Sequence, residues 1–449
     1  MTAPTKPRVE RGQELELTID ALAFGGAGVA RRDGYVVFVR DAVPGDRVRA
    51  VVTKRKKAYA EARAVAILEP SPQRAPALAD HPGAPWQVLP YERQLAVKAE
   101  QVQDALRRIG GLEDFAMEPI VPAVEQWRYR NKLEYSFGHD GGLLICGFHA
   151  PGSWERIEHV EDCLLASEAG NRARRAALAW CRERGLAAYD RRAQSGLLRN
   201  LVVREGRRTG DVQVRIVTSD ERVDLDGFAE AVGAGSVLWT RALGIGETTT
   251  GGVTEVLHGT ETIDEELGGR RFRISADAFF QTNTEMAEQL YAVAGEYADL
   301  QGWERVYDLF CGIGTIGLSL ATRAGEVWGL ELVEEAVADA LANARLNEVD
   351  NAQFFAGDVR LALRELVERA GRPDVLVVDP PRAGLSSKVV RRISEAAPKR
   401  IVYVSCNPTT LAPNAAQLVE AGYALRRVRP VDMFPQTPHI ECVALLERG

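Results

Sequence analysis

The chain has 449 residues, of which 46% are hydrophobic and 27% charged, and its formal net charge is −7 at pH 7. This length predicts two or three domains, and the composition is that of an ordinary globular protein. No apolar run approaches the roughly 20 residues of a membrane helix, and the first residues show no apolar core of a secretory signal, so we expect neither. Six scattered cysteines do not match a disulfide framework, which favours the reducing cytoplasm.

Positive charge is gathered in local patches although the chain is acidic overall. The patches lie at residues 54–57, at Arg172, Arg174 and Arg175, and at Arg191, Arg192, Arg199 and Arg204. A protein that acts at one site of an RNA can be acidic overall and basic where it contacts phosphate. The simpler interpretation of any one patch is a solvated surface.

Residues 12–70 are expected to form a small barrel. The segments 15–19, 35–39 and 48–53 have strand character, and turn signals stand at residues 25–28 and 44–45. Short strands at this spacing suit a five-stranded barrel of the oligonucleotide-binding type, although a purely structural barrel is the alternative. The pattern from Gly26 through residues 34–39 to Val48 resembles the TRAM domain. That resemblance implies that residues 1–70 are an OB-like β-barrel that binds RNA.

Residues 71–275 are expected to hold a linker helix and an α+β central domain. A linker rich in proline and alanine at 69–87 precedes an amphipathic helix over 91–108. Strand-like segments follow at 130–137, 143–148, 197–204, 212–218 and 271–274, with one helix over 168–184. We expect this domain to contact RNA, but its internal topology cannot be read from the pattern.

From residue 276 onward, strands alternate with helices. The expected strands are 306–310, 327–332, 352–356, 375–378, 400–404, 425–431 and 440–446, and the helices are 316–324, 334–347, 359–370, 388–397 and 411–421. Such alternation predicts a mostly parallel, doubly wound sheet. The fold class is therefore α/β, with a Rossmann-like domain over residues 276–449.

A glycine-rich turn and three acidic residues mark a cofactor site at the ends of these strands. Gly312, Gly314 and Gly317 match G-x-G-x-x-G between a strand and a helix. Glu331 closes the second strand and suits a ribose diol. Asp358 closes the third and could accept from an adenine amine. Dinucleotide enzymes share these features, so the turn alone does not name the ligand.

The segment Asp379-Pro-Pro-Arg382 separates dinucleotide enzymes from methyltransferases that use S-adenosylmethionine (SAM). It has no role in hydride transfer, and it resembles motif IV of the SAM-dependent methyltransferases. Enzymes of this kind that methylate amines usually carry an aromatic residue after the prolines, whereas this chain has Arg382. A strand over 401–405 presents Cys406 at its tip. Thiolate addition at C6 of a pyrimidine makes C5 nucleophilic, and a base must later remove the C5 proton. These features favour methylation of a ring carbon.

The motifs together resemble the RNA uracil-5-methyltransferase family, which includes the tRNA and 23S rRNA 5-methyluridine enzymes. The resemblance rests on residues 279–283, the glycine turn, 379–384, 405–408 and 438–442, with 129–132 and the TRAM-like segment. It implies that Cys406 is the nucleophile and that Glu441 takes the C5 proton. The implied cofactor contacts are Gln281, Phe310, Gly312, Gly314, Thr315, Glu331, Asp358 and Asp379, with Asp379 also facing the uracil. Thr315 is a departure, because the family often has asparagine there.

The same resemblance implies RNA contacts at Arg130 and Lys132. Phe279 or Phe280 would stack on a flipped base, because a base inside a duplex cannot reach such a pocket.

A second departure concerns metal. Many family members bind a [4Fe–4S] cluster through three cysteines after the TRAM domain and a fourth in the central domain. Residues 79–87 contain no cysteine, and Cys163 stands where the fourth ligand would fall. One thiolate cannot hold a cluster that needs four. We therefore predict no cluster, no role for His81 as a ligand, and no other metal site.

Two alternatives remain open. The chain could act on another RNA pyrimidine such as cytosine C5, or it could be a non-catalytic RNA-binding relative. We expect 23S rRNA or tRNA as the partner, no membrane, and a monomer.

Overall fold

The computed structural model describes residues 9–244, 246 and 249–449. The chain divides into two compact units. One comprises Met1–Asp104 together with Phe434–Ile440, and the other comprises Ala105–Met433 with Glu441–Gly449.

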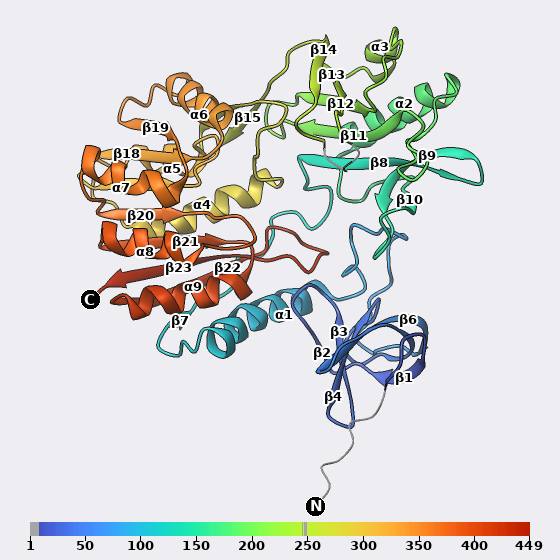
Figure 1. Cartoon of the computed structure of the whole chain (residues 1–449), viewed down its shortest axis with the longest axis horizontal. Helices are drawn as coiled ribbons and strands as arrows, with labels where there is room; N and C mark the ends of the chain where they lie inside the picture. Colours follow the sequence, from blue (N-terminus) through green and yellow to red (C-terminus); the bar gives the residue numbers. More distant parts are fainter. Residues whose placement is uncertain (1–8, 245, 247–248) are drawn as a thin grey trace, which may run out of the picture. The chain divides into compact units, whose positions relative to one another are not determined.

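The first unit contains one six-stranded sheet in the order β1-β5-β6-β4-β3-β2 (Figure 1). The strands are β1 (Glu14–Thr18), β2 (Ala21–Leu22), β3 (Gly28–Arg32), β4 (Tyr35–Arg40), β5 (Arg47–Arg55) and β6 (Tyr59–Glu69). Buried and exposed residues alternate along β1 and β5, so one face of each strand lines a core that includes Val37, Val48 and Ala50. The sequence predicted five strands. The sixth, the two-residue β2, is too short to leave an alternation signal.

Helix α1 (Tyr91–Asp104) lies in the same unit and holds the segment Phe434–Ile440. The buried Gln94 accepts from the Gln436 backbone N–H at 2.9 Å and donates from Nε2 to Gln436 Oε1 at 2.8 Å. Lys98 Nζ donates to the Phe434 carbonyl at 3.0 Å. A helix was expected over 91–108. In the structure the α-helix ends at Asp104, and a π-helical turn, η1 (Ala105–Ile109), follows it.

The second unit contains a seven-stranded sheet in the order β10-β9-β8-β11-β12-β13-β14. Its elements are β8 (Lys132–Asp140), β9 (Leu143–His149), β10 (Ile157–His159), α2 (Glu168–Glu183), β11 (Leu198–Glu205), β12 (Val212–Thr218), α3 (Phe228–Val232), β13 (Ser236–Arg241) and β14 (Val253–His258). Helix α2 packs on β9, β11 and β12. Among the described strands of this sheet, β12 and β13 pair in parallel and the other neighbours pair antiparallel. Strands β13 and β14 were not expected from the sequence.

The other large sheet has the order β19-β18-β17-β20-β21-β23-β22-β7 (Figure 1). Its elements are β7 (Ala116–Met117), β17 (Arg305–Leu309), α5 (Thr315–Ala321), β18 (Glu326–Glu331), α6 (Glu334–Leu346), β19 (Ala352–Ala356), α7 (Val359–Ala370), β20 (Val375–Val378), α8 (Ser387–Ala396), β21 (Arg400–Ser405), α9 (Pro408–Glu420), β22 (Tyr423–Val431) and β23 (Glu441–Arg448). Strands β17 to β21 pair in parallel, and β23 runs antiparallel to β21. The strand order reverses at β17, between β18 and β20, and ligands of such sheets bind beyond the carboxyl ends at this switch point.

The strand and helix positions expected from residue 300 onward are confirmed within a few residues. Helix α9 begins three residues earlier than expected, because Asn407 caps it by accepting from the Thr409 N–H at 3.0 Å and Pro408 occupies its first turn.

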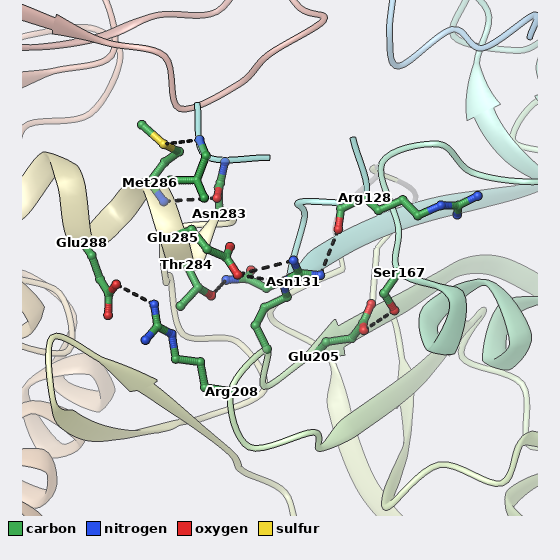
Figure 2. A network of polar contacts seen from close by, with 12 residues as sticks. Arg128, Asn131, Ser167, Glu205, Arg208, Asn283, Thr284, Glu285, Met286 and Glu288 are labelled. Carbon is green, nitrogen blue, oxygen red and sulfur yellow. Dashed lines mark hydrogen bonds and ion pairs between the residues drawn. The ribbon is translucent and has the colours of Figure 1, made fainter. Parts of the chain in front are cut away.

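Helix α4 (Thr284–Ala298) was not expected, although Asn283 caps it at Met286 N with 3.2 Å. Figure 2 shows the polar network at its N-terminus. Asn131 Nδ2 donates to Thr284 Oγ1 and to the Gln281 carbonyl, both at 2.9 Å. Thr284 in turn donates to the fully buried Glu265 at 2.6 Å, which lies in the hairpin of β15 (Ile263–Leu267) and β16 (Arg270–Ile274). This network fixes the segment 279–283 against the residues that precede β8.

Candidate active site

The glycine turn follows β17 at the switch point of the parallel sheet. Phe310 adopts φ 61°, a strained left-handed conformation for a bulky residue, and its N–H donates to the Leu330 carbonyl at 2.9 Å. Gly312 and Gly314 also have positive φ values of 53° and 84°. A Cβ at Gly314 would lie 2.9 Å from the Phe354 ring, whereas a Cβ at Gly312 would meet nothing within 4 Å. Gly312 is therefore the turn glycine whose backbone faces open space.

Gly317 serves helix packing instead. A Cβ there would lie 2.9 Å from Asp308 Oδ2, and the Gly317 N–H donates to the same oxygen at 2.8 Å. Asp308, which precedes the turn within β17, is not among the site residues predicted from the sequence. This carboxylate is buried, and its Oδ1 has no hydrogen-bond partner among the described residues. Burial raises the pKa of Asp308 to about 7 against the opposing Gly317 hydrogen bond.

Of the other expected cofactor residues, Glu331 and Thr315 lie at the glycine turn, whereas Asp358 lies at the start of α7. Glu331 lies at the turn, where it accepts from the Gly312 N–H at 3.1 Å and from the Leu332 N–H at 2.7 Å. Thr315 opens α5 and shares a hydrogen bond of 3.0 Å with the Tyr291 hydroxyl. Asp358 instead caps α7 through the Arg360 N–H at 2.9 Å and pairs with the Arg360 side chain.

Cys406 and Glu441 lie at the same end of one β-ladder. Strand β21 pairs antiparallel with β23, and Ser405 lies opposite Cys442. Cys406 directly follows Ser405 and Glu441 directly precedes Cys442, so both lie at the same end of this ladder, close enough for the charge of Glu441 to raise the pKa of Cys406. Cys406 is half-buried and Glu441 is buried. Strand pairing thus joins a thiol and a carboxylic acid that are 35 residues apart in the sequence.

Asp379 follows β20 and lies beside this pair. Its N–H donates to the Leu309 carbonyl at 3.3 Å, and burial raises the pKa of Asp379 to about 7. Burial, and then the charge of Asp379, raise the pKa of Glu441 well above its usual range. Burial, Glu441 and Asp379 in that order raise the pKa of Cys406 to about 11.

Arg382 supplies the opposing charge. It lowers the pKa of both Cys406 and Glu441, against the effects of burial and of Asp379. Asn407 Nδ2 donates to the Arg382 carbonyl at 3.0 Å, which ties the Cys406 tip to the segment 379–382. From the sequence, Arg382 indicated only the class of methyltransferase, because its effect on the two pKa values depends on contacts of the folded chain.

The three residues expected to contact RNA differ in exposure. Phe279 is 70% exposed, whereas Phe280 is buried against Phe272 with ring centroids 6.3 Å apart. Lys132 pairs with Glu134 at 2.7 Å, and desolvation lowers its pKa. Arg130 is half-buried next to the start of β8.

Neither a metal-ligand cluster nor a membrane-spanning helix occurs in the described part of the chain. Within residues 9–244, 246 and 249–449, no three His, Cys, Asp or Glu side chains form a group suited to a metal ion. Over the same residues, no helix combines the length and the apolar character that crossing a membrane requires. Cys163 is buried, and its N–H donates to Asn171 Oδ1 at 2.9 Å. The absence of an iron–sulfur cluster stays a prediction.

Comparison with known proteins identifies the family. Residues 253–449 match the model of the tRNA (uracil-5-)-methyltransferase family, and residues 8–65 match that of the TRAM domain. An uncharacterized RNA methyltransferase of Halalkalibacterium halodurans is 39% identical over 98% of both chains. Another from Bacteroides thetaiotaomicron is 39% identical over 95% of this chain and 100% of its own.

A solved structure extends the likeness to the fold. It is the Pyrococcus abyssi tRNA (uracil-54, C5)-methyltransferase in complex with S-adenosyl-L-homocysteine. The TM-score is 0.79 at 29% identity, over 96% of this chain and 99% of that one. The chain therefore belongs to the tRNA (uracil-5-)-methyltransferase family of SAM-dependent RNA methyltransferases and carries a TRAM domain.

Proposed function

We propose that this enzyme methylates C5 of a uridine in 23S rRNA or tRNA through a covalent bond between Cys406 and C6. The observation that carries the proposal is that Cys406 and Glu441 lie at the same end of the β21–β23 ladder, near enough to Asp379 for its charge to raise the pKa of both. A thiol alone would be explained as core packing. Core packing does not explain a thiol that lies near a buried acid and a glycine turn of the kind that binds cofactors.

The roles follow from what each group can do. Cys406, which is half-buried, first gives its thiol proton to solvent water. The thiolate sulfur then adds to C6, and the C5–C6 double-bond electrons move to C5. After C5 has taken a methyl group, Glu441 accepts the C5 proton, and the electrons of that C–H bond expel the sulfur from C6. The raised pKa of Glu441 makes its carboxylate a stronger base once it is ionised. Arg382 favours the thiolate form of Cys406.

SAM supplies, when bound, a methyl group on a positively charged sulfur. Two features of the chain fit such a cation. The first is the buried, negatively ionisable group of Asp308 and Asp379, with one Asp308 oxygen lacking a hydrogen-bond partner among the described residues. The second is the open space at Gly312. We assign the cofactor to Gln281, Phe310, Gly312, Gly314, Thr315, Glu331, Asp358 and Asp379, with Asp308 added.

The RNA contacts are part of the same proposal. Phe279 is exposed and suited to stack on a flipped base. Arg130 and Lys132 are proposed to contact RNA, although Lys132 would first have to leave Glu134. A three-part division at residues 70 and 275, a monomeric state and a cytoplasmic location complete the proposal.

The test is a covalent trap. The protein is incubated with labelled SAM and with tRNA or 23S rRNA transcripts that contain 5-fluorouridine, whose fluorine cannot be removed as a proton. We expect an adduct that survives denaturation, is absent in Cys406→Ala and persists in Cys181→Ala, which removes a buried thiol of α2. The transcript that forms the adduct identifies the RNA.

Two results would contradict the proposal. An adduct formed only with 5-fluorocytidine transcripts would assign the enzyme to cytosine. No adduct and no methyl transfer with either RNA would favour a non-catalytic RNA-binding relative.

A further inference from the structure

A pocket of about 380 Å³ lies on the seven-stranded sheet, and its lining includes none of the residues of the candidate active site. Its volume falls in the range of roughly 300–1,000 Å³ that is typical of small-ligand sites. Strands β8, β9, β10 and β11 contribute to its lining, together with the segments 154–155 and 188–192. The side chains that matter below are Ser136, His149, Trp154, Tyr189, Arg192 and Arg199.

Two aromatic rings of this pocket each lie next to an arginine. Trp154 is 55% exposed, and the Arg192 guanidinium lies 5.7 Å from its ring centroid. The Arg199 guanidinium lies 4.6 Å from the Tyr189 ring. Tyr189 is half-buried, so Trp154 is the exposed ring of the two. Proteins use exposed aromatic rings next to arginines to stack unpaired bases and neutralise their phosphates.

The charges of the pocket favour an anion. Arg191, Arg192 and Arg199 stand against two carboxylates. Asp190 is occupied by the backbone N–H groups of Arg192 and Ala193 at 2.8 and 3.0 Å, which are the main cause of its lowered pKa. Glu155 pairs with Arg192 on the surface, where ion pairs are weak, so a phosphate can replace it.

The floor of the pocket offers fixed polar groups. Arg199 is buried and donates to the Gly244 carbonyl at 2.6 Å, so its position is set by the fold. Asn200 Nδ2 donates to Ser136 Oγ at 3.2 Å, and the same oxygen lies 3.2 Å from His149 Nε2. Side chains held in this way can read the edge of a base that is no longer paired.

We propose that this pocket binds a second, unpaired nucleotide of the substrate RNA, with the base against Trp154 and the phosphate at Arg191 and Arg192. The inference rests on the proposed function only in that the protein binds an RNA substrate. It does not depend on the proposed methyl transfer. It gives the enzyme a contact to a loop or end of the RNA at a distance from the methylated uridine. Such a contact selects an RNA by its unpaired segments rather than by the target base.

The test measures RNA affinity in the Cys406→Ala protein, so that no variant reacts. Fluorescence anisotropy with labelled tRNA and 23S rRNA transcripts compares Trp154→Ala with Trp303→Ala, which removes another exposed tryptophan, located outside the pocket. We expect Trp154→Ala to weaken binding about tenfold, since base stacking is commonly this strong. Trp303→Ala should bind unchanged, and Trp154→Phe should restore most of the affinity.

Three results would overturn the proposal. These are equal affinities of Trp154→Ala and Trp303→Ala, a loss on replacing Arg191 and Arg192 without any loss at Trp154, and full competition by free adenosine or uridine monophosphate. In otherwise wild-type protein, Trp154→Ala should raise KM and leave kcat unchanged. A protein that binds RNA through Trp154 but transfers no methyl group would refute the proposed function and leave this inference standing.

Discussion

At the scale of single residues, the acidic groups of the candidate active site have raised pKa values in the protein without ligand. Asp308 and Asp379 have pKa values raised to about 7 by burial, and the pKa of Glu441 is raised well above its usual range. Cys406 remains a thiol at neutral pH, since its pKa is about 11. A positively charged ligand next to these groups would favour their ionised forms. The ionisation of these groups therefore depends on the charge of the bound ligand.

One prediction concerns cofactor affinity and pH. A bound cation requires Asp308 and Asp379 to be ionised, so below about pH 7 binding must also remove their protons. We expect the Kd of SAM to rise as pH falls from 8 to 6, by about tenfold for each group that must lose a proton per pH unit below its pKa. S-adenosylhomocysteine lacks the charged sulfur and should show a shallower dependence. Isothermal titration calorimetry measures both ligands, and parallel pH profiles would contradict the prediction.

A second prediction separates the nucleophile from the base. In Glu441→Gln the C5 proton cannot be removed, so the bond between Cys406 and C6 cannot be eliminated. We expect kcat to fall by at least about 10³-fold, within the range of a lost general base, while a covalent RNA adduct accumulates even with ordinary uridine. Denaturing gels detect this adduct, and adding Cys406→Ala should abolish it. Normal turnover by Glu441→Gln would assign the proton to another group.

At the scale of elements, helix α4 joins the segment 279–283 to the rest of the second unit. Asn131 Nδ2 donates to Thr284 Oγ1 at the start of α4 (Figure 2) and to the Gln281 carbonyl in the segment before it. Asn283 Nδ2 donates to the Met433 carbonyl at 2.9 Å. The resemblance implied RNA contacts at Arg130 and Lys132, which flank Asn131. In the structure, Asn131 holds the segment 279–283 and the start of α4 through its two hydrogen bonds.

A third prediction tests this role of Asn131 with a matched pair of variants. Asn131→Ala leaves the Gln281 carbonyl and Thr284 without a buried donor, which should cost about 1–3 kcal/mol of unfolding free energy. It should also weaken SAM binding, because Gln281 loses its anchor. Asn351→Ala removes two similar bonds, to the Ala321 and Ala324 carbonyls at 2.8 and 3.0 Å, outside the site. Urea unfolding should show comparable losses, and only Asn131→Ala should change the Kd of SAM.

At the scale of the whole molecule, net charge and RNA binding are separate properties. The net charge of −7 does not oppose RNA binding if positive side chains gather where phosphates lie. Residues 54–57 are exposed at the end of β5 and in the turn after it. This patch belongs to the unit that carries the TRAM domain.

A fourth prediction measures that separation. The logarithm of RNA affinity should fall linearly with the logarithm of salt concentration despite the acidic chain. Replacing Lys56 and Lys57 by alanine should reduce the slope by about 0.7 for each single-stranded phosphate that the protein no longer neutralises. Arg364→Ala, which removes an exposed arginine paired with Glu368 on α7, should leave the slope unchanged. Equal slopes for all three proteins would place the RNA-binding surface elsewhere.

Local patterns were sufficient to predict the parallel sheet and its motifs, because alternation of strands and helices and the residues at strand ends are local properties of the chain. They were insufficient for α4, for strands β13 and β14, and for the central sheet, whose order depends on contacts between distant segments. Asp308 shows the limit for the site. An aspartate in a strand carries no local sign that packing against Gly317 will bury it and raise its pKa.

The sequence by itself determined the kind of chemistry available, since the thiol of residue 406, the acid of residue 441 and the glycines of the turn are present whatever the fold. Tertiary structure decided that the thiol and the acid meet, because only the antiparallel register of β21 with β23 brings residues 35 positions apart to one strand end. It also decided their proton affinities, because burial and neighbouring charges, which act through space, set the free energy of ionisation.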